Sequence, residues 1–144
     1  MQVGMIMTIE HKNILFFSAF FYIVFLLFSQ VFSQESKKPN PTEAVICEVV
    51  KDRTPQNQAA VFSISAGKIF CFTNFDPVPE KTVICHNWFR TDILNTKIKL
   101  VLNPPKWSTF SSIQLRESDK GPWRVEVTDS DGNILNTLRF SITD

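Results

Sequence analysis

The chain has 144 residues, 15 basic and 14 acidic side chains, and a formal net charge of +1. This length is too short for two ordinary domains, and the balanced charge argues against a basic surface for nucleic acid or another acidic polymer. Hydrophobic residues make up 44% of the chain, which is normal for a globular protein.

The first segment of the chain is strongly apolar. Residues 14–28, ILFFSAFFYIVFLLF, contain no charged residue, and Lys12 precedes them. A basic start, an apolar stretch and a following small residue are typical of a secretory signal, with the best cleavage point after Ser33. The alternative is an uncleaved anchor, because residues 14–32 approach the roughly 20 residues that span a bilayer. Both interpretations predict an extracytoplasmic location, either periplasmic, secreted, or membrane-anchored with the domain facing outward.

A polar linker follows the apolar segment. Residues 34–43, QESKKPNPTE, contain two prolines and no large apolar side chain, so they cannot contribute to a core. We therefore assign residues 1–33 to a signal peptide or membrane anchor, residues 34–43 to the linker, and residues 44–144 to one domain with one modest core.

Within this domain the apolar residues recur with a period near 2, which is typical of β-strands. Seven segments show the pattern: residues 43–51, 68–75, 82–90, 96–102, 107–115, 123–129 and 134–142. Turn sequences separate them, and Asp131-Gly132 supplies the positive φ angles of a tight hairpin. No segment after residue 43 has a helical pattern. The sequence predicts an all-β fold, an immunoglobulin-like antiparallel β-sandwich of six to seven strands, preceded by an N-terminal hydrophobic helix.

These segments also resemble a known family. CEVVKDRTP, IFCFTNF, HNWFR, WSTFSS and GPWRVEVTDSDGNILNTLRFSI, in this order, are similar to the bacterial family catalogued as domain of unknown function 2914. The resemblance covers roughly residues 45–143. Its most specific part is the ending, with Gly121, Trp123, Val125, Val127, Asp131, Gly132, Leu135, Phe140 and Ile142. His86 and Trp88 fall where the family carries a His-x-Trp pair. The resemblance implies the fold and a location near a membrane but no activity, and we expect these positions to be structural.

The three cysteines have two alternative interpretations. Cysteines of exported proteins tend to pair, although an odd number leaves one over. A hairpin of residues 68–75 and 82–90 would place Cys71 opposite Cys85, whereas Cys47 could meet either of them across a sandwich. The alternative is three buried thiols that pack as small apolar residues. Cys71 and Cys85 are not signatures of the family.

Metal and nucleophilic chemistry have little support in the sequence. Cys85 and His86 are neighbours on a predicted strand, so their side chains point to opposite faces and cannot easily share a metal or a reaction. The paired spacing C-x-x-C of zinc sites and the nucleophile motif G-x-S-x-G are both missing. DSDGN lacks the spacing of a calcium loop and is explained as a turn. We expect no cofactor or metal, and a buried, hydrogen-bonded His86 beside Trp88.

Because no catalytic motif is present, the sequence favours a non-enzymatic module that binds an envelope protein, a glycan or another extracytoplasmic partner. Trp107, after a pair of prolines, is the tryptophan expected to be partly exposed and available for such contacts. One alternative is a small extracytoplasmic hydrolase or redox enzyme that uses His86 or a cysteine. Another is a purely structural domain that residues 14–32, if uncleaved, would tether to a membrane. Neither alternative involves nucleic acid.

Overall fold

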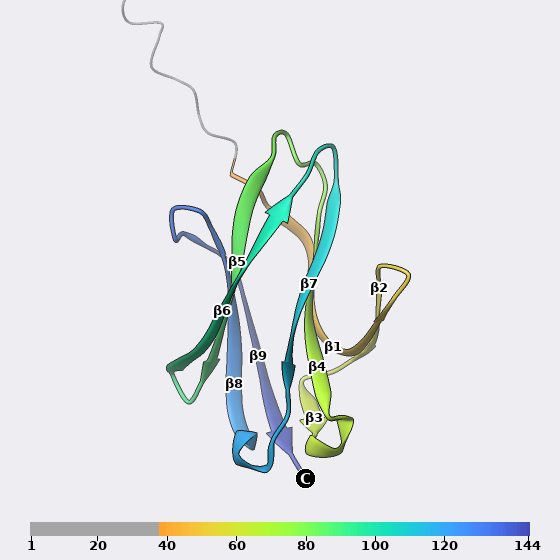
Figure 1. The fold of residues 1–144 in the computed structure, drawn as a ribbon, viewed down its shortest axis with the longest axis vertical. Coiled ribbons are helices and arrows are strands. Elements are labelled where there is room, and N and C mark those ends of the chain that lie inside the picture. Colours follow the sequence, from red (N-terminus) through yellow and green to blue (C-terminus); the bar gives the residue numbers. More distant parts are fainter. Residues whose placement is uncertain (1–37) are drawn as a thin grey trace, which may run out of the picture. The chain divides into compact units, whose positions relative to one another are not determined.

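The computed structural model describes residues 38–144, which form nine β-strands in two sheets and contain no α-helix (Figure 1). The all-β prediction is therefore confirmed. No helix in this part of the chain is long and apolar enough to cross a membrane. The predicted signal or anchor, residues 1–33, lies outside the described residues. Strand β1 begins at Pro41, so the last three residues that we assigned to the linker are the first residues of a strand.

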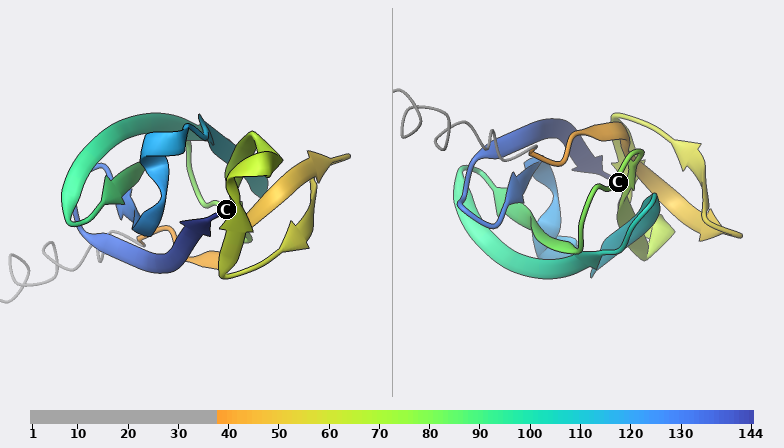
Figure 2. Two further views of the ribbon diagram at one scale, coloured as in Figure 1. Left: turned by 90° about the horizontal axis from the view of Figure 1, so that it is seen from below. Right: turned by 90° about the horizontal axis from the view of Figure 1, so that it is seen from above.

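The four-stranded sheet has the order β2-β1-β4-β7 with antiparallel neighbours. Its strands are β1 (Pro41–Lys51), β2 (Thr54–Gln58), β4 (Lys68–Phe75) and β7 (Trp107–Gln114). The five-stranded sheet has the order β3-β9-β8-β5-β6, in which only β3 and β9 are parallel. Its strands are β3 (Val61–Ser63), β9 (Ile134–Thr143), β8 (Gly121–Asp129), β5 (Thr82–Arg90) and β6 (Ile93–Leu102). Figure 2 shows the two sheets end-on, enclosing the core between them.

The predicted number of six to seven strands was wrong, because β2 and β3 were not foreseen. Strand β2, TPQNQ, has no large apolar residue and contains Pro55, and β3 has only 3 residues. Strand β6 also begins earlier than predicted. A two-residue turn with positive φ angles at Thr91 (46°) and Asp92 (63°) joins it directly to β5. Thr91 is unusual in a turn of this type, and Asp92 stands where glycine is preferred, so the turn carries no strong sequence signal.

The predicted hairpin between residues 68–75 and 82–90 does not form. Strand β4 pairs with β1 and β7, whereas β5 pairs with β6 and β8, so the two strands lie in different sheets. Cys71 belongs to the core between the sheets, whereas Cys85 lies on the opposite side of β5 from the core residues Ile84 and Trp88. The disulfide that we considered between them is therefore not formed. Cys47, Cys71 and Cys85 are all free and buried.

The core consists of two apolar clusters. The larger one is built around four aromatic side chains, in which Phe140 stacks on Trp123 (centroids 6.2 Å apart) and meets Trp88 and Phe62 edge-on. The smaller cluster contains Phe75, Val78, Ile84, Leu102 and Val127. Along the inward faces of β4 and β5, one polar residue separates the two clusters on each strand. These residues are Thr73 on β4 and His86 on β5, and both are fully buried.

The predicted turn between the last two strands forms a hairpin. Oδ1 of Asp129 accepts hydrogen bonds from the backbone N–H groups of Asp131 (3.0 Å) and Asn133 (2.9 Å), and Oδ2 accepts one from Nδ2 of Asn133 (2.8 Å). Gly132 has a φ of 85°, which only glycine adopts without strain. These bonds fix the carboxylate of Asp129 inside the turn. The side-chain bond from Asn133, together with the two backbone bonds, lowers the pKa of Asp129.

Candidate functional site

His86 lies at the centre of the sandwich and connects the two sheets. It projects from β5 between Ile84 and Trp88, and its side chain is 0% exposed. Its Nε2 atom is 3.2 Å from Oγ1 of Thr73 on β4, and its Nδ1 atom is 2.7 Å from Oγ of Ser111 on β7. Both partners belong to the opposite sheet. One imidazole ring therefore links β5 to two strands of the four-stranded sheet.

Trp88 completes this buried network. Its Nε1–H group donates a hydrogen bond to Oγ of Ser111 at 3.0 Å. If the hydroxyl of Ser111 donates to Nδ1 of His86, the Nε2–H group of His86 donates to Oγ1 of Thr73. This tautomer gives one continuous series of donors from Trp88 to Thr73, whereas the other tautomer would leave the Ser111 proton without an acceptor in the network. We therefore assign the proton of the neutral ring to Nε2.

The surroundings of His86 favour the neutral ring. Burial lowers its pKa from 6.5 to about 4. The residues beside it in neighbouring strands are apolar, namely Val127 on β8 and Ile98 on β6. Cys71, next to Ser111 in the sheet, is uncharged because burial raises the pKa of its thiol. No carboxylate of residues 38–144 is hydrogen-bonded to the ring to balance an imidazolium, so His86 is uncharged at neutral pH.

A serine hydroxyl 2.7 Å from an imidazole nitrogen resembles the nucleophile and base of a hydrolase. Three observations argue against that chemistry. Ser111 is only 5% exposed and His86 is 0% exposed, so the hydroxyl has no path to a substrate. The second ring nitrogen meets the hydroxyl of Thr73 instead of a carboxylate. Trp88 also donates to the same serine oxygen. The arrangement acts as a polar cross-link between the sheets.

Sequence reasoning missed Thr73 and Ser111, although a signal for them existed. Ser111 alternates with Ile113 along β7, and Thr73 alternates with Cys71 and Phe75 along β4. A polar residue on the inward face of an otherwise apolar strand must find a buried partner. Together with His86, these two positions could have indicated a polar layer within the core.

Cys85 takes no part in this network. Its register partners are Lys99 on β6 and Thr128 on β8, on the outward face of the five-stranded sheet. It is 5% exposed because these neighbours cover it. Within residues 38–144, no group of three or more His, Cys, Asp or Glu side chains is placed to hold a metal ion. Cys85 and His86 thus occupy separate faces of β5.

The tryptophans divide into two kinds. Trp88 and Trp123 are buried, and Nε1 of Trp123 donates to the backbone oxygen of Asp119 at 2.7 Å. Trp107 is partly buried against the smaller core cluster, and the guanidinium of Arg53 lies 5.4 Å from its ring centroid. Arg53 is in the turn of the β1-β2 hairpin, which extends away from the sandwich (Figure 2). The three rings therefore do not form one exposed platform.

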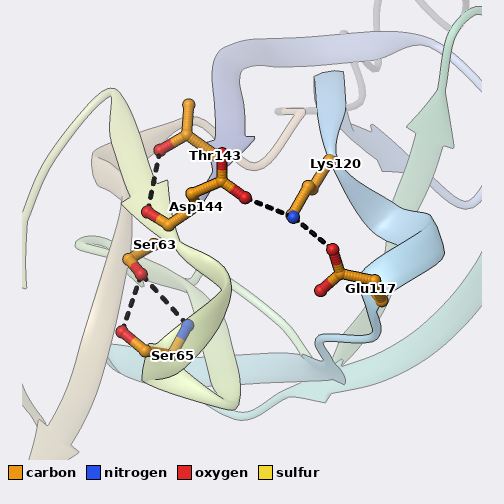
Figure 3. Close-up of polar contacts among 6 residues, drawn as sticks. All are labelled: Ser63, Ser65, Glu117, Lys120, Thr143 and Asp144. Carbon is orange, nitrogen blue, oxygen red and sulfur yellow. Dashed lines mark hydrogen bonds and ion pairs between the residues drawn. The ribbon is translucent and has the colours of Figure 1, made fainter.

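A second polar cluster lies where β3 and β9 end (Figure 3). The ammonium group of Lys120 lies between the carboxylates of Glu117 and Asp144, and Oγ of Ser63 caps a turn by accepting from the backbone N–H of Ser65 at 3.1 Å. The side chains of Glu117 and Asp144 are 78% and 95% exposed. Ion pairs this exposed contribute little to stability. The cluster offers a solvated surface rather than an enclosed site.

Apolar side chains reach the surface on both sheets. Phe110 on β7 and Val49 on β1 are 48% and 42% exposed on the four-stranded sheet. On β6, Ile93 is 73% exposed, Leu94 50% and Val101 45%. Where such side chains form a contiguous patch, they commonly mark a contact with a partner.

Part of the described chain matches the model of a known protein family. The model of a family described as "Protein of unknown function (DUF2914)" matches residues 81–142. These residues are similar to the DUF2914 family. The predicted resemblance is thus confirmed for this part of the chain. The DUF2914 segment runs from β5 to β9 and includes His86, Trp88 and Ser111, whereas Thr73 precedes it. Among curated proteins, no sequence matches the chain.

Proposed function

We propose that this protein, which is similar to the DUF2914 family over residues 81–142, is a non-enzymatic, extracytoplasmic binding module of a bacterial cell envelope. The observation that carries the proposal is the burial of His86 and Ser111, because the best-placed base and nucleophile are both enclosed between the sheets. Exposed apolar residues on both sheets offer contact surfaces instead. The partner is an envelope protein, a glycan or another extracytoplasmic component.

An immunoglobulin-like arrangement supports this proposal. Strands β4, β5 and β8 take the places of the immunoglobulin strands B, C and F, and β9 pairs with β8 as strand G pairs with F. A buried tryptophan on strand C is a feature of that fold, and Trp88 occupies this place. Cys71 lies on the strand equivalent to B, while the strand equivalent to F carries Val125 in the same core cluster. Sandwiches of this kind serve many binding functions, which is support by analogy only.

The proposed location rests on residues 14–33. Their apolar stretch and the following small residue favour cleavage after Ser33. N-terminal analysis of the exported protein is expected to begin at or near Gln34. Recovery of an intact Met1 end in the membrane fraction would establish the anchor, and recovery of the intact chain in the cytoplasm would contradict the location.

The binding function can be tested by photo-crosslinking in cells of the native host. A photoreactive phenylalanine analogue replaces one exposed residue at a time in the full-length chain: Val61 on β3, Leu94 on β6 or Phe110 on β7. We expect light-dependent adducts at one of these surfaces and none at the others. If no position gives an adduct, the module has no stable partner there and the proposal fails.

The enzymatic alternative needs a separate test. Full-length protein and its Ser111→Ala variant are compared on ester and amide substrates. A turnover that Ser111→Ala abolishes while the fold persists would replace the binding proposal with a hydrolase. Equal, background-level turnover in both proteins is the expected result.

A further inference from the structure

We propose that strand β6 is a docking edge for an extended acidic peptide segment, which joins the five-stranded sheet as an additional strand. This inference rests on the proposed binding function and specifies its surface and the chemistry of its partner. Among the described residues 38–144, strand β6 is the last strand of its sheet, and its only neighbouring strand is β5 (Figure 1). Its other side offers backbone donors and acceptors that an extended peptide can pair with.

The other sheet edges are less suitable. Strand β3 has 3 residues, and β2 has 5 residues including Pro55, which lacks a backbone donor. Strand β7 is longer, but its inward residues Ser111 and Ile113 are already buried, so an added strand would cover little more. Strand β6 has 10 residues and is the longest of the four edges.

The inward face of β6 would gain from an added strand. Ile98 packs against the larger core cluster and Leu100 against the smaller one, yet both remain only partly buried. Within residues 38–144 no strand lies beyond β6 in this sheet, so these two side chains are not covered on that side. Alternate apolar side chains of an added peptide would cover them and remove their apolar surface from water.

The outward face of β6 determines the charge of the partner. Lys97 and Lys99 are exposed there, two residues apart, and their register partners on β5 are the uncharged Asn87 and Cys85. The carboxylate of Glu126, on the strand beyond β5, is 3.0 Å from Nε of Arg124. Neither lysine forms a salt bridge with any residue of the described range 38–144. Two uncompensated positive charges on an edge strand attract acidic residues at alternate positions of a partner.

The same lysines argue against a second copy of this chain as the occupant. Lysine on an edge strand is a common protection against uncontrolled pairing between sheets. If two β6 strands paired around their centres, like charges would lie opposite or diagonal to each other and destabilise the pair. A peptide with glutamate or aspartate at every second position turns this repulsion into attraction. The charges therefore select the partner as well as protect the edge.

The start of β6 extends the docking surface. Ile93 and Leu94 are 73% and 50% exposed directly after the two-residue turn. Exposed apolar side chains at this end can contact the end of a docked peptide, next to its ionic contacts with Lys97 and Lys99. This combination of apolar, ionic and backbone contacts on one edge fits an extended segment better than a compact ligand.

The test uses the isotope-labelled full-length chain in detergent and NMR titration with synthetic peptides. The first probe is a ten-residue peptide of alternating glutamate and valine, and the second has lysine in place of glutamate. We expect the acidic peptide to shift the backbone amides of β6 and to bind at least about tenfold more tightly than the basic one. Two further acidic peptides carry N-methyl groups on every valine or on every glutamate. One of them is expected to lose binding, because N-methylation removes the donors from one edge of the strand.

A charge-reversal pair completes the design. The double variant Lys97→Glu, Lys99→Glu should weaken binding of the acidic peptide at least about tenfold, whereas Lys68→Glu on the four-stranded sheet should leave it unchanged. Equal binding of both N-methylated peptides, or shifts confined to residues around Phe110, would overturn the docking edge. Absence of any shift at β6 would do the same. If cellular cross-links then form at Phe110 or Val61, the binding function stands and only the β6 inference fails.

Discussion

The Nδ1 atom of His86 lies 2.7 Å from the Oγ atom of Ser111, and this contact joins strand β5 to the opposite sheet. On either side of it the core is apolar, with Trp88 in one cluster and Ile84 in the other. Apolar packing alone tolerates small shifts of one sheet over the other. A buried hydrogen bond between fixed atoms does not, because a shift would leave both groups unpaired. The contact therefore helps to define how the two sheets are aligned.

Loss of the Ser111 hydroxyl should destabilise the fold measurably. Ser111→Ala leaves Nε1 of Trp88 without an acceptor and Nδ1 of His86 without a donor, and each group stays buried. We expect a loss of about 1–3 kcal/mol in the free energy of unfolding, measured by urea denaturation. Ser112→Ala is the matched control, because the side chain of Ser112 is only partly buried and forms no side-chain hydrogen bond within residues 38–144. A loss as small in Ser111→Ala as in Ser112→Ala would show that the network adds no stability.

Stability should decrease in mild acid because of His86. Its pKa in the folded protein is about 4 and its ordinary value is 6.5, so between these pH values the unfolded chain binds a proton that the folded chain does not. Above pH 6.5 both states are neutral and the effect is absent. As the pH falls from 6.5 to 4, the free energy of unfolding should fall by about 3 kcal/mol. Urea denaturation at intervals of half a pH unit measures this slope.

The control for the pH effect is His86→Gln, which has no titrating group at this position. Its stability at pH 7 should be lower than that of the native sequence, but its slope between pH 6.5 and 5 should be flatter. Carboxylates titrate at lower pH, and the pKa of Asp129 is lowered further by its turn bonds, so they contribute little in that interval. An unchanged slope in the variant would mean that other groups cause the acid sensitivity.

The sequence was sufficient for the fold class but not for the pairing of strands. Alternating apolar residues located most of the strands, because one face of each had to be buried. The pattern does not reveal which strands share a sheet. Residues 76–81 have the length of a hairpin loop, yet they connect β4 in one sheet to β5 in the other. For this reason the sequence predicts Cys71 and Cys85 opposite each other in one hairpin, whereas the structure places them in different sheets.

The polar network shows a similar limit. The strand pattern indicated that His86 and Trp88 share a face, but the partners of His86 come from β4 and β7, which are 13 and 25 residues away in the sequence. Contacts between two sheets depend on how the sheets are stacked, and a period of 2 carries no information about stacking. Thr73 and Ser111 could be identified only as polar residues on apolar faces.

Truncation of Trp123 should cost more stability than truncation of Trp107. Trp123 is 4% exposed, stacks on Phe140 and donates a hydrogen bond from Nε1, so Trp123→Ala should remove about 3–5 kcal/mol. Trp107 is only partly buried, and Trp107→Ala should cost distinctly less. The two variants are compared by thermal and urea denaturation of the same preparation. A loss below about 1 kcal/mol for Trp123→Ala would contradict its place in the core.

The three cysteines should react as free thiols only when the chain unfolds. Cys47, Cys71 and Cys85 are buried and unpaired, and burial raises the thiol pKa of Cys47 and Cys71, so little reactive thiolate is present at pH 8. A thiol reagent such as dithionitrobenzoate should therefore label the folded protein very slowly. In denaturant without a reductant, it should release three equivalents of thionitrobenzoate per chain, one for each free thiol. Cys71→Ser should be less stable than Cys85→Ser, because it places a hydroxyl inside the larger apolar cluster. A single reactive thiol in denaturant would reveal a disulfide, and a disulfide mapped to Cys71 and Cys85 would contradict the separation of β4 and β5.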